Sequence, residues 1–275
     1  MKEYEFTDQD FEHLRRFIAH KTGIAIADNK RELVYGRIAR RLRATGLDSF
    51  AEYRRLLESG HSEELEEFIN VITTNLTSFF RERHHFDYLR DTLLPELLQK
   101  HRHRRLRIWS AGCSTGEEAY SIAISALECR QVLSARDRIQ IIATDLDSSV
   151  VAKARSGVYE QERIESLDRQ LVKKYFLKGR GRNAGRVRVK PEVAELIEFS
   201  QLNLMEPWPF DEPFDVIFCR NVIIYFDLPT QARLVDRFAG SLDPQGYLFI
   251  GHSETLHKVS DRFELLGKTI YRRVR

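Results

Sequence analysis

The stretch Ile108-Trp-Ser-Ala-Gly-Cys-Ser-Thr-Gly-Glu-Glu-Ala-Tyr-Ser121 decides the fold, because it leads from a short apolar run through a loop of small residues into a helical pattern. Gly112 and Gly116 allow the backbone of this loop to approach a ligand closely. A P-loop would end in Gly-Lys-Ser or Gly-Lys-Thr, whereas Glu117 and Glu118 stand where phosphate would be repelled. The stretch therefore indicates either a binding loop for a cationic ligand or a purely structural strand-to-helix turn.

Short apolar runs alternate with helical patterns along the chain beyond Arg107. This alternation predicts an α/β fold with a doubly wound, mostly parallel sheet and crossover helices. The segment from Phe263 to Val274 reads as two strands around a Gly-Lys turn, so we expect the sheet to finish with an antiparallel hairpin. The expected strands are 108–109, 139–143, 196–199, 214–219 and 247–250, and the expected helices are 117–130, 148–155 and 229–241.

Two regions depart from this alternation. Residues 8–75 show helical patterns alone, which predicts a small all-helical domain. Residues 157–194 contain several glycines followed by the alternating run Arg186 to Lys190, which predicts a small β insert. The expected N-terminal helices are 10–20, 29–44, 49–57 and 62–71. The expected domains are a helical domain at 1–75, a linker at 76–90 and a sheet domain at 91–275 that contains the insert.

The composition is that of an ordinary globular protein of 275 residues, 42% of them hydrophobic, with a formal net charge of +3. The N-terminus lacks the features of a signal peptide, and no run reaches the roughly 18 apolar residues of a membrane span. Cys113, Cys129 and Cys219 form no C-x-x-C pair and have no histidine at metal-ligand spacing. We therefore expect a cytoplasmic protein with free thiols, no metal site and no insertion into the membrane.

Polar residues follow the expected strands at one edge of the sheet. Asp145 ends the second strand, where an acidic residue usually accepts hydrogen bonds from a ribose diol, whereas Asp147 is better suited to capping the next helix. Asn203 and Asn221 follow two other strands and face the same crevice, although either alone is more often a turn residue. S-adenosylmethionine carries an ammonium and a sulfonium group, whereas a dinucleotide carries a pyrophosphate, so the acidic loop favours S-adenosylmethionine.

Four separated motifs carry a resemblance to a known family. They are Thr73-Thr-Asn-Leu-Thr-Ser-Phe-Phe-Arg-Glu82, Trp109-Ser-Ala-Gly-Cys-Ser-Thr-Gly-Glu-Glu118, Phe214-Asp-Val-Ile-Phe-Cys-Arg-Asn-Val-Ile-Ile-Tyr-Phe226 and Gly251-His-Ser-Glu254. In this order they resemble the chemotaxis receptor glutamate methyltransferases, the CheR family, over nearly the whole chain. The resemblance implies a class I methyltransferase-like fold and an enzyme that esterifies glutamate side chains of chemoreceptors, serving adaptation. It also implies S-adenosyl-L-methionine as cofactor and S-adenosyl-L-homocysteine as product.

The resemblance assigns roles to single residues. Glu118 would bind the methionine amino group, with the adjacent Glu117 as the alternative for this contact. Asp145 would hold the ribose. Arg81 and Tyr225 are the expected catalytic residues: Arg81, together with Arg220, would align the incoming carboxylate, and Tyr225 would orient it. The alternative is that both arginines only pair with Glu117, Glu118 or surface acids. The carboxylate needs no general base, since the reference pKa of glutamate is near 4.3. The cofactor-binding residues implied are Asn75, Thr77, Arg81, Gly112, Glu118, Asp145, Asn203, Leu204, Arg220 and Asn221.

Basic residues cluster between Lys30 and Arg43 on an expected helix. At about 100° per residue, Lys30, Arg37, Arg40 and Arg41 fall on one side of the helix, and apolar residues such as Ile38 fall on the other. We interpret the basic side as a docking face for the acidic methylation helices of chemoreceptors, the alternative being an ordinary solvated face. The expected docking residues are Arg37, Arg40, Arg41 and Arg43.

The insert offers a second expected contact with the receptor. The run Val187-Arg-Val189 reads as an exposed strand edge that accepts an extended peptide by strand addition. The resemblance adds that some family members grip a C-terminal tether of the receptor here, and that Gly179-Arg-Gly181 resembles the loop of those members. The expected tether residues are Gly179, Gly181, Val187 and Arg188.

Two other functions are compatible with the sequence. The basic helix also suits an RNA or small-molecule methyltransferase, but no interleaved aromatic residues near it offer a stacking platform, so we expect no nucleic acid partner. A cofactor-binding adaptor without catalysis is the other alternative, which the presence of Arg81, Asp145, Asn221 and Tyr225 disfavours.

Overall fold

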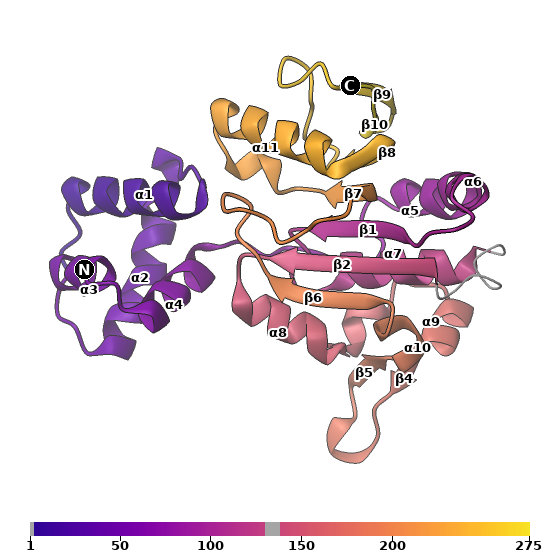
Figure 1. Cartoon of the computed structure of the whole chain (residues 1–275). Coiled ribbons are helices and arrows are strands. Elements are labelled where there is room, and N and C mark those ends of the chain that lie inside the picture. The colour runs from indigo at the N-terminus through magenta and orange to yellow at the C-terminus, as the bar shows by residue number, and fades with distance from the viewer. Residues whose placement is uncertain (1–2, 130–137) are drawn as a thin grey trace.

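Seven strands form one sheet with the order β6-β2-β1-β7-β8-β10-β9 in the computed structural model, which describes residues 3–129 and 138–275 (Figure 1). Strands β6, β2, β1, β7 and β8 pair in parallel, and β10 is antiparallel to both β8 and β9. The strands are β1 (Leu106–Ala111), β2 (Ile139–Asp145), β6 (Ile197–Gln201), β7 (Phe214–Cys219), β8 (Leu242–Ile250), β9 (Phe263–Gly267) and β10 (Ile270–Arg273). The doubly wound, mostly parallel sheet and its closing antiparallel hairpin are therefore confirmed.

Buried side chains cover both faces of this sheet, as a parallel sheet requires. Alternate residues of β1 belong to different clusters: Ile108 lies with Tyr120 of α7, whereas the ring of Trp109 lies 5.5 Å from that of Phe238 of α11. The helices around the sheet are α5 (His84–Tyr88), η2 (Leu89–Leu93), α6 (Leu94–Lys100), α7 (Glu117–Glu128), α8 (Ser148–Ser156), η7 (Ile223–Tyr225) and α11 (Leu228–Ser241). The sequence pattern predicts no helix at 84–100, and Arg130 of the expected helix 117–130 lies outside the described residues.

The N-terminal region is an all-helical lobe, as predicted (Figure 1). Its first helix begins at a capping box, in which the hydroxyl of Thr7 accepts from the N–H of Asp10 and the carboxylate of Asp10 accepts from the N–H of Thr7. Gly23 ends that helix in the left-handed conformation, with φ of +77°. The helices are α1 (Asp8–Thr22), η1 (Asp28–Lys30), α2 (Arg31–Thr45), α3 (Phe50–Glu58) and α4 (Ser62–Ile72).

The insert is a separate antiparallel sheet with the order β3-β5-β4. The run 186–189 forms its central strand, with Val187 and Val189 buried and only Arg188 between them exposed. The prediction that this run is an exposed edge is therefore wrong, because both of its sides are already hydrogen-bonded to neighbouring strands. The elements are β3 (Val158–Glu160), η5 (Gln161–Ile164), α9 (Arg169–Tyr175), β4 (Phe176–Lys178), η6 (Gly181–Asn183), β5 (Arg186–Val189) and α10 (Pro191–Ala194).

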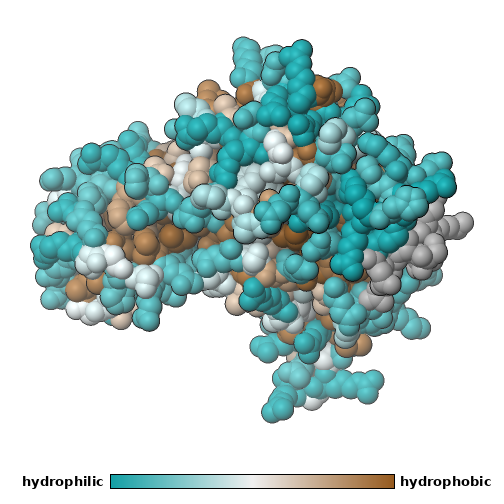
Figure 2. Space-filling model, in the orientation of Figure 1, coloured by the Kyte–Doolittle hydropathy of each residue, from teal (hydrophilic) through white to brown (hydrophobic). Residues whose placement is uncertain are grey.

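The helical lobe contacts the edge of the sheet where the parallel strands end. The N–H of Ala25 donates to the carbonyl oxygen of Tyr225 at 2.8 Å, and the side chain of Asn203 donates to the carbonyl oxygen of Lys21 at 2.8 Å. Apolar side chains are visible along the junction between the lobe and the sheet domain (Figure 2). The loops that follow the strands therefore face the lobe, and both domains contribute to what lies between them.

Candidate active site

A pocket of about 680 Å³ opens between the helical lobe and the loops that follow β1, β2, β6 and β7. Part of its wall comes from residues 24–27 of the lobe and from the connecting segment 72–77. All the residues that the sequence predicts for cofactor binding or catalysis line this pocket. They are Asn75, Thr77, Arg81, Gly112, Glu118, Asp145, Asn203, Leu204, Arg220, Asn221 and Tyr225. Side chains from segments far apart in the sequence thus meet in one place.

The loop after β1 presents its backbone to the pocket. Gly112 has φ of +92°, and a Cβ on it would lie 2.4 Å from Cγ2 of Val222. The N–H of Gly112 donates to the carbonyl oxygen of Thr144 at 2.8 Å, which ties the loop to the end of β2. A side chain at position 112 would be strained and sterically blocked, so glycine is required there.

The buried carboxylate of Glu118 and the partly buried carboxylate of Asp145 form an acidic wall of the pocket. Glu118 accepts from the hydroxyl of Ser110 at 2.8 Å and from the guanidinium of Arg220 at 3.0 Å. Burial raises the pKa of Glu118, and the charge of Arg220 opposes this shift. Asp145 accepts from the backbone N–H groups of Ser114 at 2.7 Å and Asp147 at 3.1 Å, and burial raises its pKa to about 6.

The acidic neighbours of these residues have structural partners instead. Glu117 is fully buried, accepts from the hydroxyl of Thr115 at 2.6 Å and pairs with Arg163 of the insert. Asp147 caps α8 by accepting from the N–H of Ser149 at 2.9 Å, which is the role that the sequence favours for it. Of the adjacent pair Glu117 and Glu118, Glu118 is therefore the one that faces the pocket.

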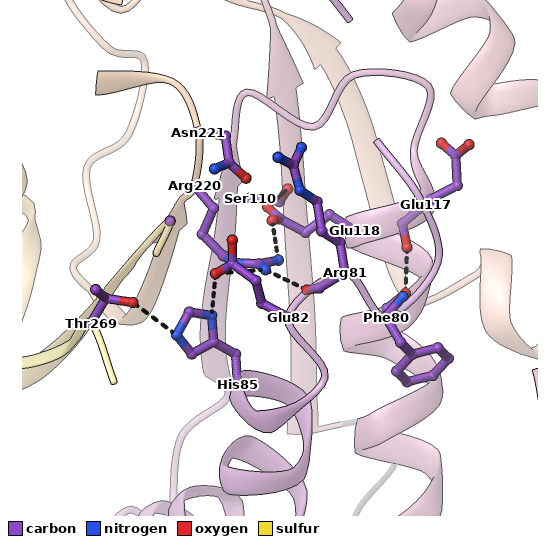
Figure 3. Close-up of polar contacts among 12 residues, drawn as sticks. Phe80, Arg81, Glu82, His85, Ser110, Glu117, Glu118, Arg220, Asn221 and Thr269 are labelled. Carbon is purple, nitrogen blue, oxygen red and sulfur yellow. Dashed lines mark hydrogen bonds and ion pairs between the residues drawn. The ribbon is translucent and has the colours of Figure 1, made fainter. Parts of the chain in front are cut away.

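Arg220 lies between two carboxylates at the base of the pocket, where Figure 3 shows Glu82, Glu118 and Arg220 converging. Its side chain is 2% exposed, and it also donates to the carbonyl oxygen of Arg81. Burial acts to raise the pKa of Glu82, but the hydrogen bond from His252 and the charge of Arg220 outweigh it and lower the pKa to about 2. One guanidinium thus pairs with both carboxylates, and these contacts hold it in place.

The connecting segment forms the remaining side of the pocket. The amide of Asn75 donates to the carboxylate of Asp147 at 2.7 Å, and the carbonyl oxygen of Thr77 accepts from Arg163 at 2.7 Å. The side chain of Arg81 donates to the carbonyl oxygen of Leu76 at 2.9 Å while lining the pocket. Asn75 is thus already engaged by an acid, whereas the guanidinium of Arg81 retains further donors.

Comparisons with known proteins agree with this geometry. The family model "CheR methyltransferase, SAM binding domain" matches residues 75–272, and the model "CheR methyltransferase, all-alpha domain" matches residues 9–73. The chain belongs to the CheR methyltransferase family. It is therefore a methyltransferase that uses S-adenosylmethionine as its cofactor.

Relatives in this family match nearly the full length of the chain. Chemotaxis protein methyltransferase 2 of Pseudomonas aeruginosa is 47% identical over 98% of this chain and 95% of its own length. The chemotaxis protein methyltransferase of Escherichia coli is 45% identical over 96% of this chain and 91% of its own length. That of Borreliella burgdorferi is 38% identical over 91% of this chain and 89% of its own. Among the described residues, no helix is both long and apolar enough to cross a membrane.

The residues of the pocket fit the CheR cofactor. Glu118, which is buried, and Asp145, which is partly buried, are acceptors that line the pocket, as an amino group and a ribose require, and Gly112 leaves space that any side chain would fill. The histidine beside this site does not suit proton transfer. Burial lowers the pKa of His85 to about 4, and one of its ring nitrogens lies 2.8 Å from the carbonyl oxygen of Lys268. This CheR-family site thus offers positioning and charge rather than a general base.

The predicted docking face on α2 requires a correction. The side chain of Arg41 is 19% exposed and pairs with the buried carboxylate of Glu64 at 2.6 Å. Arg37 donates to the carbonyl oxygens of Ile72 and Thr73 and lines the pocket. The prediction that Arg37 and Arg41 belong to a free basic face is therefore wrong, because α4 and the connecting segment lie against that side of the helix.

The other two arginines of this face are exposed. Arg40 is exposed on α2, and Arg43 is exposed and forms a surface ion pair with Glu3 at 2.6 Å. Surface pairs of this kind contribute little to stability and exchange partners at low cost. Arg40 and Arg43 thus stay available to an acidic partner.

The ion pair of Arg41 makes a prediction about stability. Arg41→Ala is expected to lower the free energy of unfolding by about 3–5 kcal/mol, because Glu64 would keep a buried charge without its cation. Glu64 is 5% exposed, and the hydroxyl of Tyr53, which donates to it at 2.6 Å, carries no charge. Urea denaturation measures the effect, with Arg40→Ala on the same helix as the control, expected within about 0.5 kcal/mol of the unaltered chain. Equal losses in both variants would contradict it.

Some residues of the site could not be predicted from the sequence. Residues 24–27 line the pocket, but their apolar side chains carry no chemical signal. Glu82 belongs to a quoted motif, and only the fold reveals that it pairs with Arg220. Ser110, which donates to Glu118, stands in the deciding stretch, where its small size suggests only a loop residue.

Proposed function

We propose that this chain transfers the methyl group of S-adenosylmethionine to glutamate side chains of chemoreceptors, forming methyl esters that serve adaptation in chemotaxis. The observation that carries the proposal is the charge distribution of one pocket. Its inner wall is acidic, with Glu118 and Asp145, while Lys30, Arg37 and Arg81 line it from the lobe and the connecting segment. An acidic wall suits a cationic methyl donor, and basic side chains suit an acceptor that is an anion.

The part of the pocket that would hold the methyl donor contains the hydrogen-bond acceptors. We infer that Glu118 holds the methionine amino group, that Asp145 holds the ribose, and that Asn203 and Leu204 border the adenine. Arg220 and Asn221 then close the methionine end. When bound, the cofactor supplies a methyl group on a positively charged sulfur. The role of the chain is to hold the methionine end of the cofactor in place and to exclude water from it, because charges interact more strongly where water is absent.

The acceptor half follows from the ionisation of glutamate. Its carboxylate is ionised at neutral pH and attacks without losing a proton first, so positioning is the main requirement. Holding the reacting atoms in line can supply on the order of 7–11 kcal/mol. We infer that Arg81 aligns the carboxylate by charge and that Tyr225 orients it by hydrogen bonding.

The raised pKa of Asp145 predicts how binding depends on pH. The ribose hydroxyls donate to the ionised carboxylate, so affinity for S-adenosylhomocysteine is expected to fall as pH drops through about 6. The loss from about pH 7.5 to about pH 5 should be roughly tenfold, since one unit below the pKa about a tenth of the groups stay ionised. Stability of the free chain has the opposite sign, because ionising an acid of raised pKa lowers stability as pH rises.

Calorimetric titrations at several pH values test this dependence. Asp145→Asn removes the titrating group and is expected to bind weakly with a flatter pH profile. A profile as steep in Asp145→Asn as in the unaltered chain would assign the dependence to another group.

We propose that the receptor's methylation helices dock near Arg40 and Arg43 and that its tail contacts the insert. The supporting observation for the tail is β4, an outer strand with Leu177 48% exposed and Gly179 at its end. An extended peptide adds to a free edge by backbone hydrogen bonds. Titration with an aromatic, acidic receptor-tail peptide should give heat that Leu177→Asp weakens and that Leu228→Asp, at another exposed leucine, leaves unchanged. Absence of heat would remove the tether.

One labelling experiment tests the proposed function. The chain is incubated with receptor-containing membranes and S-adenosylmethionine labelled in its methyl group, and base is then added. We expect volatile methanol from the receptor band after base, and, from a portion kept without base, peptide masses that map the methyl to glutamates. Label in RNA or a small molecule would favour another substrate, and no transfer to any acceptor would favour a cofactor-binding adaptor.

A further inference from the structure

In the motif Gly251-His-Ser-Glu254, only His252 has been given a contact in the site described above, through Glu82. It follows β8 directly and lies beside the loop after β7, which carries Arg220, Asn221 and the short helix with Tyr225. Glu254 is 6% exposed, yet it is not among the described residues that line the pocket. A buried acid just behind a binding site needs partners, and its partners indicate what it does.

Both carboxylate oxygens of Glu254 accept hydrogen bonds from backbone groups. Oε2 accepts from the N–H of Asn221 at 2.9 Å and from the N–H of Gly251 at 2.5 Å, and Oε1 accepts from the N–H of Ile224 at 3.2 Å. Asn221 has φ of +59°, a left-handed conformation that asparagine adopts more readily than other residues with a side chain. The carboxylate of Glu254 therefore holds both the left-handed start of the turn 221–225, at Asn221, and its helical part, at Ile224.

The other residues of the motif act on the same loop. A Cβ on Gly251 would lie 2.3 Å from Nδ2 of Asn221, so only glycine leaves room for that amide. The ring of His252 lies 2.8 Å from Oε1 of Glu82, whose other oxygen lies 3.3 Å from Arg220. The motif thus contacts Asn221 directly and Arg220 through Glu82.

We propose that Glu254 is a positioning residue for methyl transfer, which fixes the turn 221–225 so that Asn221 and Tyr225 keep their places in the pocket. Among the described residues no lysine, arginine or histidine forms an ion pair with Glu254, so the backbone N–H groups are its partners. Glutamine has the same shape but turns an N–H group toward one of these donors, which loosens the turn. This inference rests on the proposed function in one respect, because its test uses a chemoreceptor as the methyl acceptor.

The test compares methyl-transfer kinetics of Glu254→Gln, Tyr225→Phe and the double variant. Glu254→Gln is expected to lower kcat on the order of 10- to 100-fold, because a shift of about 1 Å in a positioned group can cost 10²-fold. Receptor KM should change less than about threefold, since the docking surface is untouched. The kcat of the double variant should be about three- to tenfold higher than the value expected if the two single losses multiplied. The effects of two residues that act through one another do not combine independently.

Controls separate positioning from a general loss of structure. Asp168→Asn is the matched variant, since Asp168 accepts from the N–H groups of Gln170 at 2.8 Å and Leu171 at 3.2 Å in the insert. Its kcat should stay within about twofold of the unaltered chain. A kcat of Glu254→Gln within that same range, or strictly multiplicative losses in the double variant, would overturn the proposal.

A second variant covers the case in which Glu254→Gln does not fold. Gly251→Ala pushes on Asn221 without removing the carboxylate, and its kcat is expected to fall by a similar factor, on the order of 10- to 100-fold. A folded Gly251→Ala chain with unaltered kcat would overturn the proposal. If the unaltered chain itself methylates no receptor, the proposed function fails, whereas this inference fails when the unaltered chain and the variants are equally active.

Discussion

Arg220→Ala is expected to weaken binding of S-adenosylhomocysteine on the order of 10- to 100-fold and to lower the free energy of unfolding by about 3–5 kcal/mol. The guanidinium lies 3.0 Å from Glu118 and 3.3 Å from Glu82. Without it, both carboxylates lose their buried cation, and Glu118 favours its neutral form. The charge proposed to hold the amino group of the ligand is then gone. Calorimetric titration measures the first effect and urea denaturation the second.

Arg104→Ala is the matched control for this prediction. Arg104 pairs with the fully buried carboxylate of Asp215 at 2.6 Å, before the start of β1 and thus at the other end of the strand from the pocket. Its loss should destabilise the chain by a similar mechanism and leave affinity for S-adenosylhomocysteine unchanged. Unchanged affinity in Arg220→Ala as well would contradict the role given to the Glu118–Arg220 pair.

Arg81→Ala and Tyr225→Phe are expected to lower kcat by a larger factor than they lower the affinity for S-adenosylhomocysteine. Both side chains line the pocket, and Arg81 presents a guanidinium there that is not held by any carboxylate among the described residues. Misplacing a reacting group can cost on the order of 10²-fold, which we expect when Arg81→Ala removes the group that aligns the carboxylate, and we expect about tenfold for Tyr225→Phe. Initial rates at saturating receptor and cofactor give kcat, and titration with S-adenosylhomocysteine gives the affinity.

Arg83→Ala provides the comparison on the same segment. The side chain of Arg83 is 60% exposed, and its ion pair with Asp87, at 3.8 Å, is long. We expect kcat within about twofold of the unaltered chain. Undiminished turnover in both Arg81→Ala and Tyr225→Phe would remove these side chains from the mechanism.

The sheet could be predicted because its signals are local. Short apolar runs bounded by loops identify the parallel strands, and the stretch from Ile108 to Ser121 identifies the crossing into a helix. Since the carboxyl ends of neighbouring parallel strands meet at one edge, the sequence alone is enough to expect Gly112, Asp145 and Asn221 in one crevice. Their meeting around one pocket follows from topology, and the roles proposed for them follow from chemistry.

The contacts of α2 could not be predicted in the same way. Helical periodicity assigns a residue to a side of the helix, but it does not say which other element lies against that side. Glu64 of α4 lies against the basic side and pairs with Arg41, and the end of α4 accepts from Arg37. A basic residue that balances a buried acid looks, in the sequence, like one that faces water.

The prediction of an exposed edge in the insert was wrong for a related reason. The alternation in 186–189 predicts a strand correctly, but whether that strand lies at an edge depends on its neighbours. Those neighbours, Val158–Glu160 and Phe176–Lys178, are three residues long, which is too short for a period of two to be recognised. The role of Glu254 could not be predicted either, because its partners are backbone N–H groups, which every residue except proline carries.

Calorimetric titration with S-adenosylhomocysteine, on the unaltered chain and on Glu118→Gln and Glu117→Gln, tests most directly whether the pocket between the lobe and the strand ends holds the methyl donor. We expect one ligand per unaltered chain, an affinity weakened on the order of tenfold or more in Glu118→Gln, and an affinity within about twofold in Glu117→Gln. No heat with the unaltered chain, or equal affinities in the two variants, would show that this acidic wall does not bind the donor.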